Sequence, residues 1–380
     1  MTDNKQFHGS DLEKIEKIYG IPKNQIISFG ANVNPLGASQ KVHKALCSNM
    51  DSISRYPDRD YVELRKAIGN YTNAKPEYIM VGNGCTELIS LFIKTLSPRN
   101  TLILGPSYSE YERDIELCKG SYKYFFLKEG RDFDLNVRTL FDKLAKHVNL
   151  LIFCNPNNPT STALSVKTIQ RILSYCQKRN IFVLIDETYA EFAPKELSIS
   201  AIPLVDNYTN LMILRGTSKF FAAPGLRLGY GICSDNLLLL RMKKQQNPWS
   251  VNSMAEVAGR VMFADRTYIQ NTRRLVELER TRLKLEFSSW KSIQVYDSAC
   301  NFFFARILNS NLTSAQVFEH CIQKGLMIRD CASFPGLDER FFRFCIMLPA
   351  QNDLLLAALY ELLEKPLVED KEVAYLEDEE

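Results

Sequence analysis

The residues with the clearest chemical capacity lie in one segment, RGTSKFFAAPGLRLGY, at positions 215–230. It places the amine of Lys219 directly after the hydroxyls of Thr217 and Ser218 and ahead of the guanidinium of Arg227. A lysine amine can form a Schiff base with an aldehyde, and hydroxyl and guanidinium groups are donors that suit a phosphate. An isolated loop lysine is usually only a solvated charge. As a group, these residues predict a site for pyridoxal phosphate.

A carboxylate follows a predicted buried strand. The run LIDETY, at positions 184–189, begins with apolar and β-branched residues and then reaches Asp186. Ligands bind at the carboxyl ends of parallel strands, where a carboxylate can pair with a protonated pyridine nitrogen. Tyr189 could hydrogen-bond the phenolic oxygen of the same ring. Taken alone, Asp186 could also be a helix N-cap.

An Asn/Pro turn follows another apolar run. The run at Leu150–Cys154 leads into NPNNPT at positions 155–160, where the prolines exclude a helix. Asn157 could reach the phenolic oxygen as well. Such a cluster alone predicts only a turn. However, turn, acid and lysine come in this order with strand and helix patterns between them, which favours one α/β cofactor site.

With these motifs in this order, the chain resembles the fold type I pyridoxal-phosphate enzymes, the aspartate-aminotransferase superfamily, in the histidinol-phosphate aminotransferase subgroup. The resemblance covers nearly all of the chain. It is closer still to the threonine-phosphate decarboxylases of cobalamin biosynthesis. The segments that carry this are His8-Gly9, FGANVNPLG at 29–37, RYPD at 55–58, QQNPWSVN at 245–252 and IRDCASFPGLD at 328–338.

The resemblance implies further cofactor contacts. Gly84, Cys85 and Thr86 open a predicted helix after a strand, so they can present backbone amides and a hydroxyl to a phosphate. Tyr108 matches the position whose ring stacks on the pyridine, although buried tyrosines are usually just packing. Tyr56 matches a tyrosine that reaches the cofactor phosphate of the neighbouring subunit, which implies a homodimer. Without the family, Tyr56 is a turn tyrosine.

The resemblance also implies the substrate contacts. Arg343 lies among apolar residues, where a guanidinium is costly to bury unless a carboxylate pairs with it. Arg329, Asn32 and Asn157 match substrate-contacting positions. His8-Gly9 matches an N-terminal segment that closes over the substrate phosphate. Arg329 could instead pair with a neighbouring acid as a surface charge.

Three positions depart from the family pattern. Gly216 stands where a serine or threonine commonly donates to the phosphate, which would put more of that contact on the two hydroxyls that follow it. Ser161 replaces the usual glycine after Pro-Thr, and we expect it to be tolerated if its φ is negative. Met347 stands where related decarboxylases often have an arginine, which could alter how the substrate is held.

The domain organisation follows from hydrophobic patterning. The chain has 380 residues, of which 46% are hydrophobic, enough for two lobes. Residues 53–254 alternate short apolar runs with amphipathic segments, which predicts a large cofactor-binding domain with a mostly parallel sheet flanked by helices. Residues 255–365 predict a smaller α+β domain that begins with one long charged helix. Residues 1–52 predict a helix and a substrate arm belonging to this smaller domain, and residues 366–380 a disordered acidic tail.

Composition argues against several other classes. The formal net charge of +3 comes without a Lys/Arg run or zinc-ligand spacing, so neither nucleic acid nor metal is expected. The ten cysteines are scattered without a Cys-x-x-Cys pair, as in reduced proteins. No apolar stretch suits a signal peptide or a membrane span. We therefore expect a soluble cytoplasmic protein.

The motifs leave the reaction open, because whichever bond at Cα stands perpendicular to the cofactor ring is the one that breaks. The branch resemblance favours a carbon-carbon lyase that decarboxylates L-threonine O-3-phosphate to (R)-1-amino-2-propanol O-2-phosphate. L-Serine O-phosphate, which would give ethanolamine phosphate, is a close variant. Histidinol-phosphate transamination is the other enzymatic alternative. A non-catalytic cofactor-binding regulator and a structural protein with an incidental lysine are the alternatives from other classes.

Overall fold

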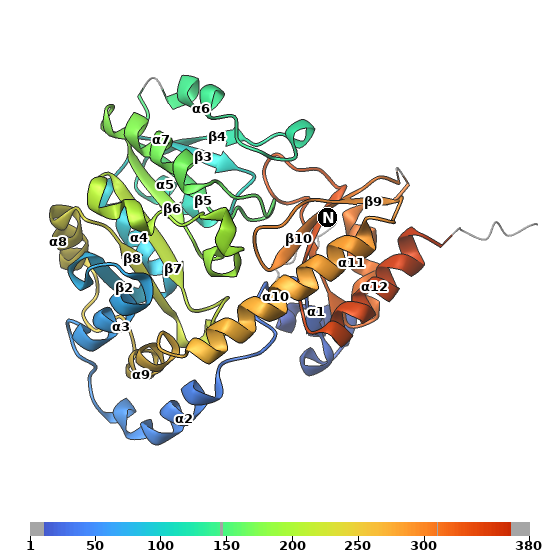
Figure 1. The fold of residues 1–380 in the computed structure, drawn as a ribbon, viewed down its shortest axis with the longest axis horizontal. Helices are drawn as coiled ribbons and strands as arrows, with labels where there is room; N and C mark the ends of the chain where they lie inside the picture. Colours follow the sequence, from blue (N-terminus) through green and yellow to red (C-terminus); the bar gives the residue numbers. More distant parts are fainter. Residues whose placement is uncertain (1–10, 145–146, 310, 366–380) are drawn as a thin grey trace, which may run out of the picture.

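The computed structural model describes residues 11–144, 147–309 and 311–365. Three sheets and twelve α-helices make up its regular structure in those ranges (Figure 1). His8, Gly9 and the acidic segment 366–380 lie outside the described residues.

A seven-stranded sheet forms the centre of the molecule, with the strand order β2-β8-β7-β6-β5-β3-β4. Only β8 runs antiparallel to its neighbours, and the other pairings are parallel. Because helices cover both faces, β5 and β7 are buried along their whole length, as their apolar sequences predict. The strands are β2 (Ile79–Asn83), β3 (Asn100–Gly105), β4 (Ser121–Phe126), β5 (Leu150–Cys154), β6 (Phe182–Asp186), β7 (Leu211–Gly216) and β8 (Leu228–Ile232).

The helices that flank this sheet have conventional amino-terminal caps at several points. Ser165, Asp235 and Asn252 each accept a backbone N–H at the start of a helix. The helix after β2 packs against β8 and β7 and begins at the edge where the parallel strands end. These helices are α3 (Val62–Thr72), α4 (Gly84–Leu96), α5 (Glu110–Leu117), α6 (Val137–Leu144), α7 (Val166–Gln177), α8 (Asn236–Gln245) and α9 (Ser253–Met262).

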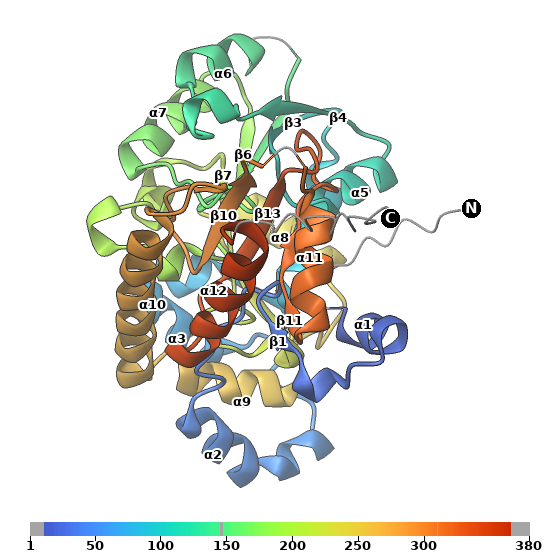
Figure 2. The same cartoon turned by 90° about the vertical axis from the view of Figure 1, so that its right-hand side faces the viewer.

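A four-stranded antiparallel sheet, in the order β12-β13-β10-β9, lies to one side of the large sheet (Figures 1 and 2). The amino-terminal segment joins it, because β1 pairs in parallel with β11 from the other end of the chain. The elements here are α1 (Leu12–Tyr19), β1 (Ile27–Ser28), β9 (Ile293–Val295), β10 (Phe302–Ile307), α11 (Ser314–Gln323), β11 (Leu326–Met327), β12 (Arg329–Asp330), β13 (Phe341–Cys345) and α12 (Pro349–Leu363). The α/β fold with a smaller antiparallel sheet is confirmed.

The prediction of one long helix beginning near residue 255 is wrong. The helix breaks after α9, and Asp265 caps the start of α10 (Arg266–Phe287) by accepting the backbone N–H of Tyr268. In addition, α9 packs against α3 and α2 (Gln40–Ser48), whereas α10 runs toward the antiparallel sheet (Figure 1). The domain boundaries drawn from the sequence stay a prediction.

The structure also bears on membrane spans, metal sites and disulfides. Across residues 11–144, 147–309 and 311–365, no helix is both long and apolar enough to span a membrane. The same residues hold no cluster of three or more His, Cys, Asp or Glu side chains that could bind a metal. All ten cysteines lie in these ranges and are free, and seven of them are buried.

Candidate active site

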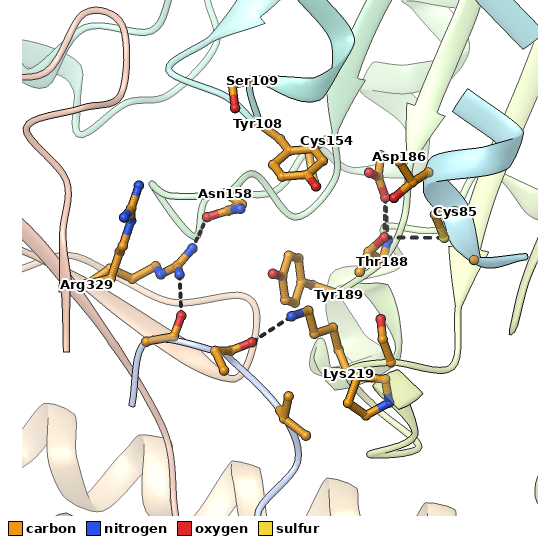
Figure 3. Close-up of a pocket in the computed structure, with 18 of the residues that line it drawn as sticks. Cys85, Tyr108, Ser109, Cys154, Asn158, Asp186, Thr188, Tyr189, Lys219 and Arg329 are labelled. Atoms are coloured by element: carbon orange, nitrogen blue, oxygen red, sulfur yellow. Dashed lines mark hydrogen bonds between the residues drawn. The ribbon is translucent and has the colours of Figure 1, made fainter. Parts of the chain in front are cut away.

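A cavity of about 650 Å³ lies at the carboxyl ends of the central parallel strands, with one wall from the antiparallel sheet. Figure 3 shows Lys219, Tyr108, Tyr189 and Asn158 directed toward this common space. Eleven of the residues predicted from the sequence line it: Gly84, Cys85, Thr86, Tyr108, Asp186, Tyr189, Ser218, Lys219, Arg227, Arg329 and Arg343.

Lys219 follows β7 and carries its amine into the cavity. Its Nζ donates a hydrogen bond to the carbonyl oxygen of Ala31 at 2.7 Å. Burial lowers the pKa of the Lys219 amine to about 8, and the charges of Arg343 and Arg227 act in the same direction. At this pKa about a tenth of the amine is neutral at pH 7, far more than for an ordinary lysine, and the neutral amine is the form that makes a Schiff base.

Asp186 is the last residue of β6 and is buried. One carboxylate oxygen accepts a hydrogen bond from the hydroxyl of Tyr111 at 2.8 Å, and the other accepts from the backbone N–H of Thr188 at 2.9 Å and from its hydroxyl. Among the described residues, no Lys, Arg or His forms an ion pair with it. A buried carboxylate with hydrogen bonds but no cation suits a cationic ring nitrogen.

The two residues that hold Asp186 were not identified from the sequence. Thr188 lies two positions beyond the aspartate, a spacing at which Asp commonly bonds its own backbone, so a local signal existed. Tyr111 comes from α5 and gives no such signal. Burial raises the pKa of Tyr111 well above its usual value, so its hydroxyl remains a neutral donor to the carboxylate.

The amino terminus of α4 offers donors for an anion. The side chain of Asn83, its N-cap residue, makes no capping hydrogen bond, which leaves first-turn N–H groups unsatisfied. Gly84 has a φ of 79°, and a Cβ there would lie 2.6 Å from Nη2 of Arg227. Helix amides and a guanidinium therefore converge at one place, with Ser218 also on the cavity wall.

Thr217 stands apart from this group. Its side chain is fully buried, its hydroxyl donates to the carbonyl oxygen of Leu228 at 3.1 Å, and it does not line the cavity. The glycine at position 216 has a steric explanation, because a Cβ there would lie 2.8 Å from Sγ of Cys85. We expected Thr217 and Ser218 to share the additional phosphate contact, but only the hydroxyl of Ser218 is on the cavity wall and can make it.

Two tyrosines border the space between Asp186 and Lys219 (Figure 3). Burial raises the pKa of Tyr108 to about 12. The hydroxyl of Tyr189 accepts a hydrogen bond from Nδ2 of Asn32 at 3.4 Å. Asn32 itself is fully buried and does not line the cavity, so it contacts the site through Tyr189.

The structure corrects the choice of Asn157. Its Nδ2 donates to the carbonyl oxygen of Pro106 at 3.0 Å and to the hydroxyl of Thr160 at 2.9 Å, which turns the side chain into the loop. The next residue, Asn158, lines the cavity, and its Oδ1 accepts a hydrogen bond from Arg343. Neighbouring residues in a turn point in different directions, and sequence alone did not distinguish these two asparagines.

Arg343 lies on β13 and is 5% exposed. Its guanidinium donates to Asn158 and, at 2.8 Å, to the carbonyl oxygen of Gly30, whereas its Nε has no partner. Within the described residues it forms no ion pair with an acid. A buried guanidinium with spare donors and no counter-ion is suited to a carboxylate ligand.

Arg329 occupies the position opposite Arg343 in the β12–β13 ladder. Its Nη2 donates to Oγ of Ser333 at 2.9 Å, and its guanidinium lies 5.4 Å from the ring centre of Phe334. Burial lowers its pKa. In the described ranges it forms no salt bridge, so the alternative of a surface ion pair is not what the structure contains.

Tyr56 lies away from the cavity. It is 80% exposed, and its ring centre lies 4.7 Å from that of Trp249. An exposed pair of aromatic side chains is consistent with a contact to another chain, but its proposed role across a subunit interface stays a prediction.

Ser161 contradicts the expectation of a negative φ, because its φ is 59°. The left-handed conformation normally favours glycine. Here the hydroxyl donates to the carbonyl oxygens of Thr160, at 2.6 Å, and Asp297, at 3.1 Å. The second bond joins the turn after β5 to the segment before β10. Met347, the third departure, lines the cavity.

The residues present fit pyridoxal phosphate. The cofactor brings an aldehyde, a cationic nitrogen and a phosphate. The cavity holds a lysine of lowered pKa, a buried carboxylate without a cation, and the uncapped amino terminus of α4 beside Arg227.

Comparisons with known proteins agree with this fit. Residues 24–359 match the family model "Aminotransferase class I and II". The threonine-phosphate decarboxylase of Salmonella typhimurium is 34% identical over 356 residues, which cover 94% of this chain and 96% of that protein. The crystal structure of the histidinol-phosphate aminotransferase from Clostridium acetobutylicum is 31% identical, with a TM-score of 0.83 over 88% of this chain and 98% of that one.

A further structure shows the same fold with the cofactor present. It is the histidinol-phosphate aminotransferase of Sinorhizobium meliloti in complex with pyridoxal-5'-phosphate, at 20% identity and a TM-score of 0.81 over 92% of this chain and 93% of that one. The family match spans most of the chain, and the Salmonella relative is 34% identical over nearly its whole length. This chain therefore belongs to the aminotransferase class I and II family of pyridoxal-phosphate enzymes.

Proposed function

We propose that this protein is a pyridoxal-phosphate-dependent decarboxylase that converts L-threonine O-3-phosphate to (R)-1-amino-2-propanol O-2-phosphate. One observation carries the proposal: Arg329 and Arg343 face each other across β12 and β13 on the cavity wall, and neither has an acidic partner in the described ranges. Such a pair suits a substrate with two anionic groups. The Salmonella relative named threonine-phosphate decarboxylase supports the same choice.

Each side chain has a definable task in this reaction. When bound, pyridoxal phosphate supplies an electron sink for the bond that breaks at Cα. Asp186 would hold positive charge on the ring nitrogen, and the first turn of α4, Ser218 and Arg227 would hold the cofactor phosphate. Tyr108 would pack against the ring. Lys219 would hold the aldehyde carbon of the cofactor and would later return a proton to Cα.

The residues on the phenolic-oxygen side of the cofactor would also orient the substrate. Asn158 and Tyr189 line the cavity and would donate to this oxygen, and Asn158 is at the same time bonded to Arg343. Arg343 takes the carboxylate and Arg329 the substrate phosphate. Decarboxylation would follow if the two arginines set the bond between Cα and the carboxylate perpendicular to the cofactor ring, since the ring assists the breaking of a perpendicular bond only.

Histidinol-phosphate transamination is the second candidate, and the structural match at 31% identity is the observation that favours it. A transaminase must also bind a phosphate and a carboxylate, but they belong to two substrates, histidinol phosphate and 2-oxoglutarate. Threonine phosphate has both groups in one molecule, which the facing arginines suit more directly. L-Serine O-phosphate is a variant of the first candidate, because one methyl group is worth only about 1 to 3 kcal/mol in a fitted pocket. A structural protein with an incidental lysine does not explain the set of cofactor residues that lines one cavity. A non-catalytic cofactor-binding regulator would keep that set, so turnover is what separates it from an enzyme.

A homodimer forms part of the proposal. Tyr56 is exposed at the surface, where it could reach a neighbouring subunit but not the cavity of its own chain. Sedimentation of the purified protein would test this, and a monomer with full activity would exclude it.

Product analysis of the cofactor-loaded protein tests the function. The protein is incubated with L-threonine O-3-phosphate, with L-serine O-phosphate, and with histidinol phosphate plus 2-oxoglutarate. Carbon dioxide from threonine phosphate is the expected result, and the ratio of the two decarboxylation rates identifies the preferred phospho-amino acid. Formation of glutamate without carbon dioxide would replace the proposal with an aminotransferase, and no turnover with cofactor bound would favour the regulator.

A further inference from the structure

The segment between β4 and α6 reaches from the large sheet to the antiparallel sheet (Figure 1). It places Phe133, which is 2% exposed, together with Leu127 of the same segment in a small apolar cluster whose other buried members come from β9–β10, β13 and the residues after β12. The ring of Phe133 makes edge-on contacts with Tyr296, Phe304 and Phe341, with ring centres 5.3, 5.3 and 5.8 Å away. The side chain of Phe133, which belongs to a connection of the large sheet, thus packs against three aromatic rings from the antiparallel-sheet region.

These rings share a sheet face with the two arginines. Phe304 lies directly opposite Arg343 in the β10–β13 ladder, and Arg329 lies opposite Arg343 on the other side. Phe341 is two residues before Arg343 on the same strand. Because side chains alternate with a period of two, and opposed residues share a face, all four side chains point to the same side of the sheet. Phe133 therefore packs on the face that carries the arginines.

The loop after β12 belongs to the same assembly. Cys331, Phe334 and Leu337 join the cluster around Phe133, and Ser333 between them accepts the hydrogen bond from Arg329. Ser333 and Phe334 also line the cavity. At the far end of the loop, a Cβ on Gly336 would lie 2.4 Å from the ring of Phe126. The loop that supports Arg329 is packed directly against β4 and the segment after it.

Backbone strain marks the same segment. Asp132 and Phe133 have φ values of 50° and 60°, in the left-handed region that a bulky residue seldom adopts. Such a conformation persists only where surrounding contacts outweigh its cost, of the order of 1 kcal/mol or more. The buried ring supplies those contacts. An ion pair between Glu129 and Arg306, at 2.6 Å, adds a second link between the sheets.

We propose that Phe133 is a positioning residue for substrate binding. Its ring holds the antiparallel sheet and the loop 331–338 at a fixed distance from the large sheet. At that distance Arg329 and Arg343 can bind the two anionic groups of the substrate together. The nature of that substrate rests on the proposed function. The cofactor residues lie on the large sheet and its connections, so they do not depend on this contact.

The test compares three variants of the cofactor-loaded protein. Phe133→Gly removes the ring and tolerates the φ of 60°, so it separates ring contact from backbone strain. Phe133→Leu keeps apolar bulk. The control Phe141→Ala deletes a ring of α6 that stacks on Tyr175 at 4.0 Å and belongs neither to the cavity wall nor to the cluster around Phe133. The readouts are KM, kcat and the cofactor absorbance band.

We expect Phe133→Gly to raise KM for the phospho-amino acid at least about tenfold, since three aromatic contacts are lost, with kcat within about twofold. Phe133→Leu should recover most of the loss. The absorbance band should stay unchanged in both. An unchanged KM in Phe133→Gly, or an equal rise in Phe141→Ala, would overturn the proposal.

A second measurement separates this inference from the proposed function. Amide hydrogen exchange of the holoprotein reports the loop and β10 directly, whichever substrate is correct. In Phe133→Gly, exchange at residues 329–338 should rise at least about fivefold while β5 and β6 keep their protection. If the unaltered protein does not turn over threonine phosphate, the proposed function is wrong. The exchange result still decides whether Phe133 positions the loop. Unaltered exchange in that loop would contradict the positioning role.

Discussion

The guanidinium of Arg343 donates a hydrogen bond to the side-chain oxygen of Asn158, joining the antiparallel sheet to the turn after β5. One end of this pair faces the space where a carboxylate would bind, and the other lies beside Tyr189 and the cavity that suits the cofactor ring. Under the proposed function, the arginine that would bind the carboxylate and the asparagine that would contact the cofactor therefore share one hydrogen bond.

Replacement of Arg343 should act mainly on substrate affinity. Arg343→Ala removes charge-assisted hydrogen bonds to a carboxylate, so we expect KM to rise by about 10- to 100-fold. Arg343→Lys should recover little, because an ammonium cannot donate in the same two-pronged geometry. Steady-state kinetics measures both. Arg171→Ala, which deletes an exposed arginine of α7, is the control and should leave KM unchanged.

Asp186 should determine the rate of the chemical step. Asp186→Asn removes the negative charge that holds positive charge on the ring nitrogen, so kcat should fall by about 100-fold or more. Tyr111→Phe, which deletes only one hydrogen bond to Asp186, should give a smaller decrease and shift the pH dependence of the cofactor absorbance. A fully active Asp186→Asn protein would show that another group supports the ring nitrogen.

The lowered pKa of Lys219 predicts a pH-dependent stability of the cofactor-free protein. The folded value is about 8, below the ordinary value of 10.5. Between these values the unfolded chain binds more protons than the folded one, so stability should rise with pH from about 8 to 10.5 and be lowest below 8. Denaturant unfolding across this range measures the effect. Lys219→Met should flatten the rise, and Lys178→Met, on an exposed lysine, should not.

Cofactor uptake should follow the same ionisation. Only the neutral amine attacks an aldehyde, so the rate should increase about tenfold per pH unit well below 8 and level off above it. Absorbance on mixing the cofactor-free protein with pyridoxal phosphate records this rate. A rate that keeps rising toward pH 10 would mean that the pKa of Lys219 is not lowered.

Gly216 should be coupled to Cys85. A side chain at position 216 would meet Sγ of Cys85 at 2.8 Å, so Gly216→Ser should weaken cofactor binding despite adding a hydroxyl. Adding Cys85→Ala should restore the affinity, because the smaller side chain makes room for the serine. A double-mutant cycle on the cofactor dissociation constant measures the coupling, and additive effects would rule it out.

Several features could be predicted from local sequence. The apolar runs that became β5, β6 and β7 are buried because helices cover both faces of a parallel sheet, and such strands need no polar alternation. Chain order then placed Asp186 and Lys219 at the same edge of that sheet. One helix boundary was harder to predict. The break between α9 and α10 depends on capping by Asp265, a short-range signal within a long amphipathic pattern.

The sequence determined the chemistry of the site, since a lysine, a carboxylate and a glycine-led helix start are recognisable by type and spacing. Tertiary structure alone decided which side chains face the cavity. Asn158 replaced Asn157 because adjacent turn residues diverge, and Thr217 turned inward to Leu228. The support of Asp186 by Tyr111, and of the arginine face by Phe133, joins segments distant in the chain, and no local pattern records such contacts.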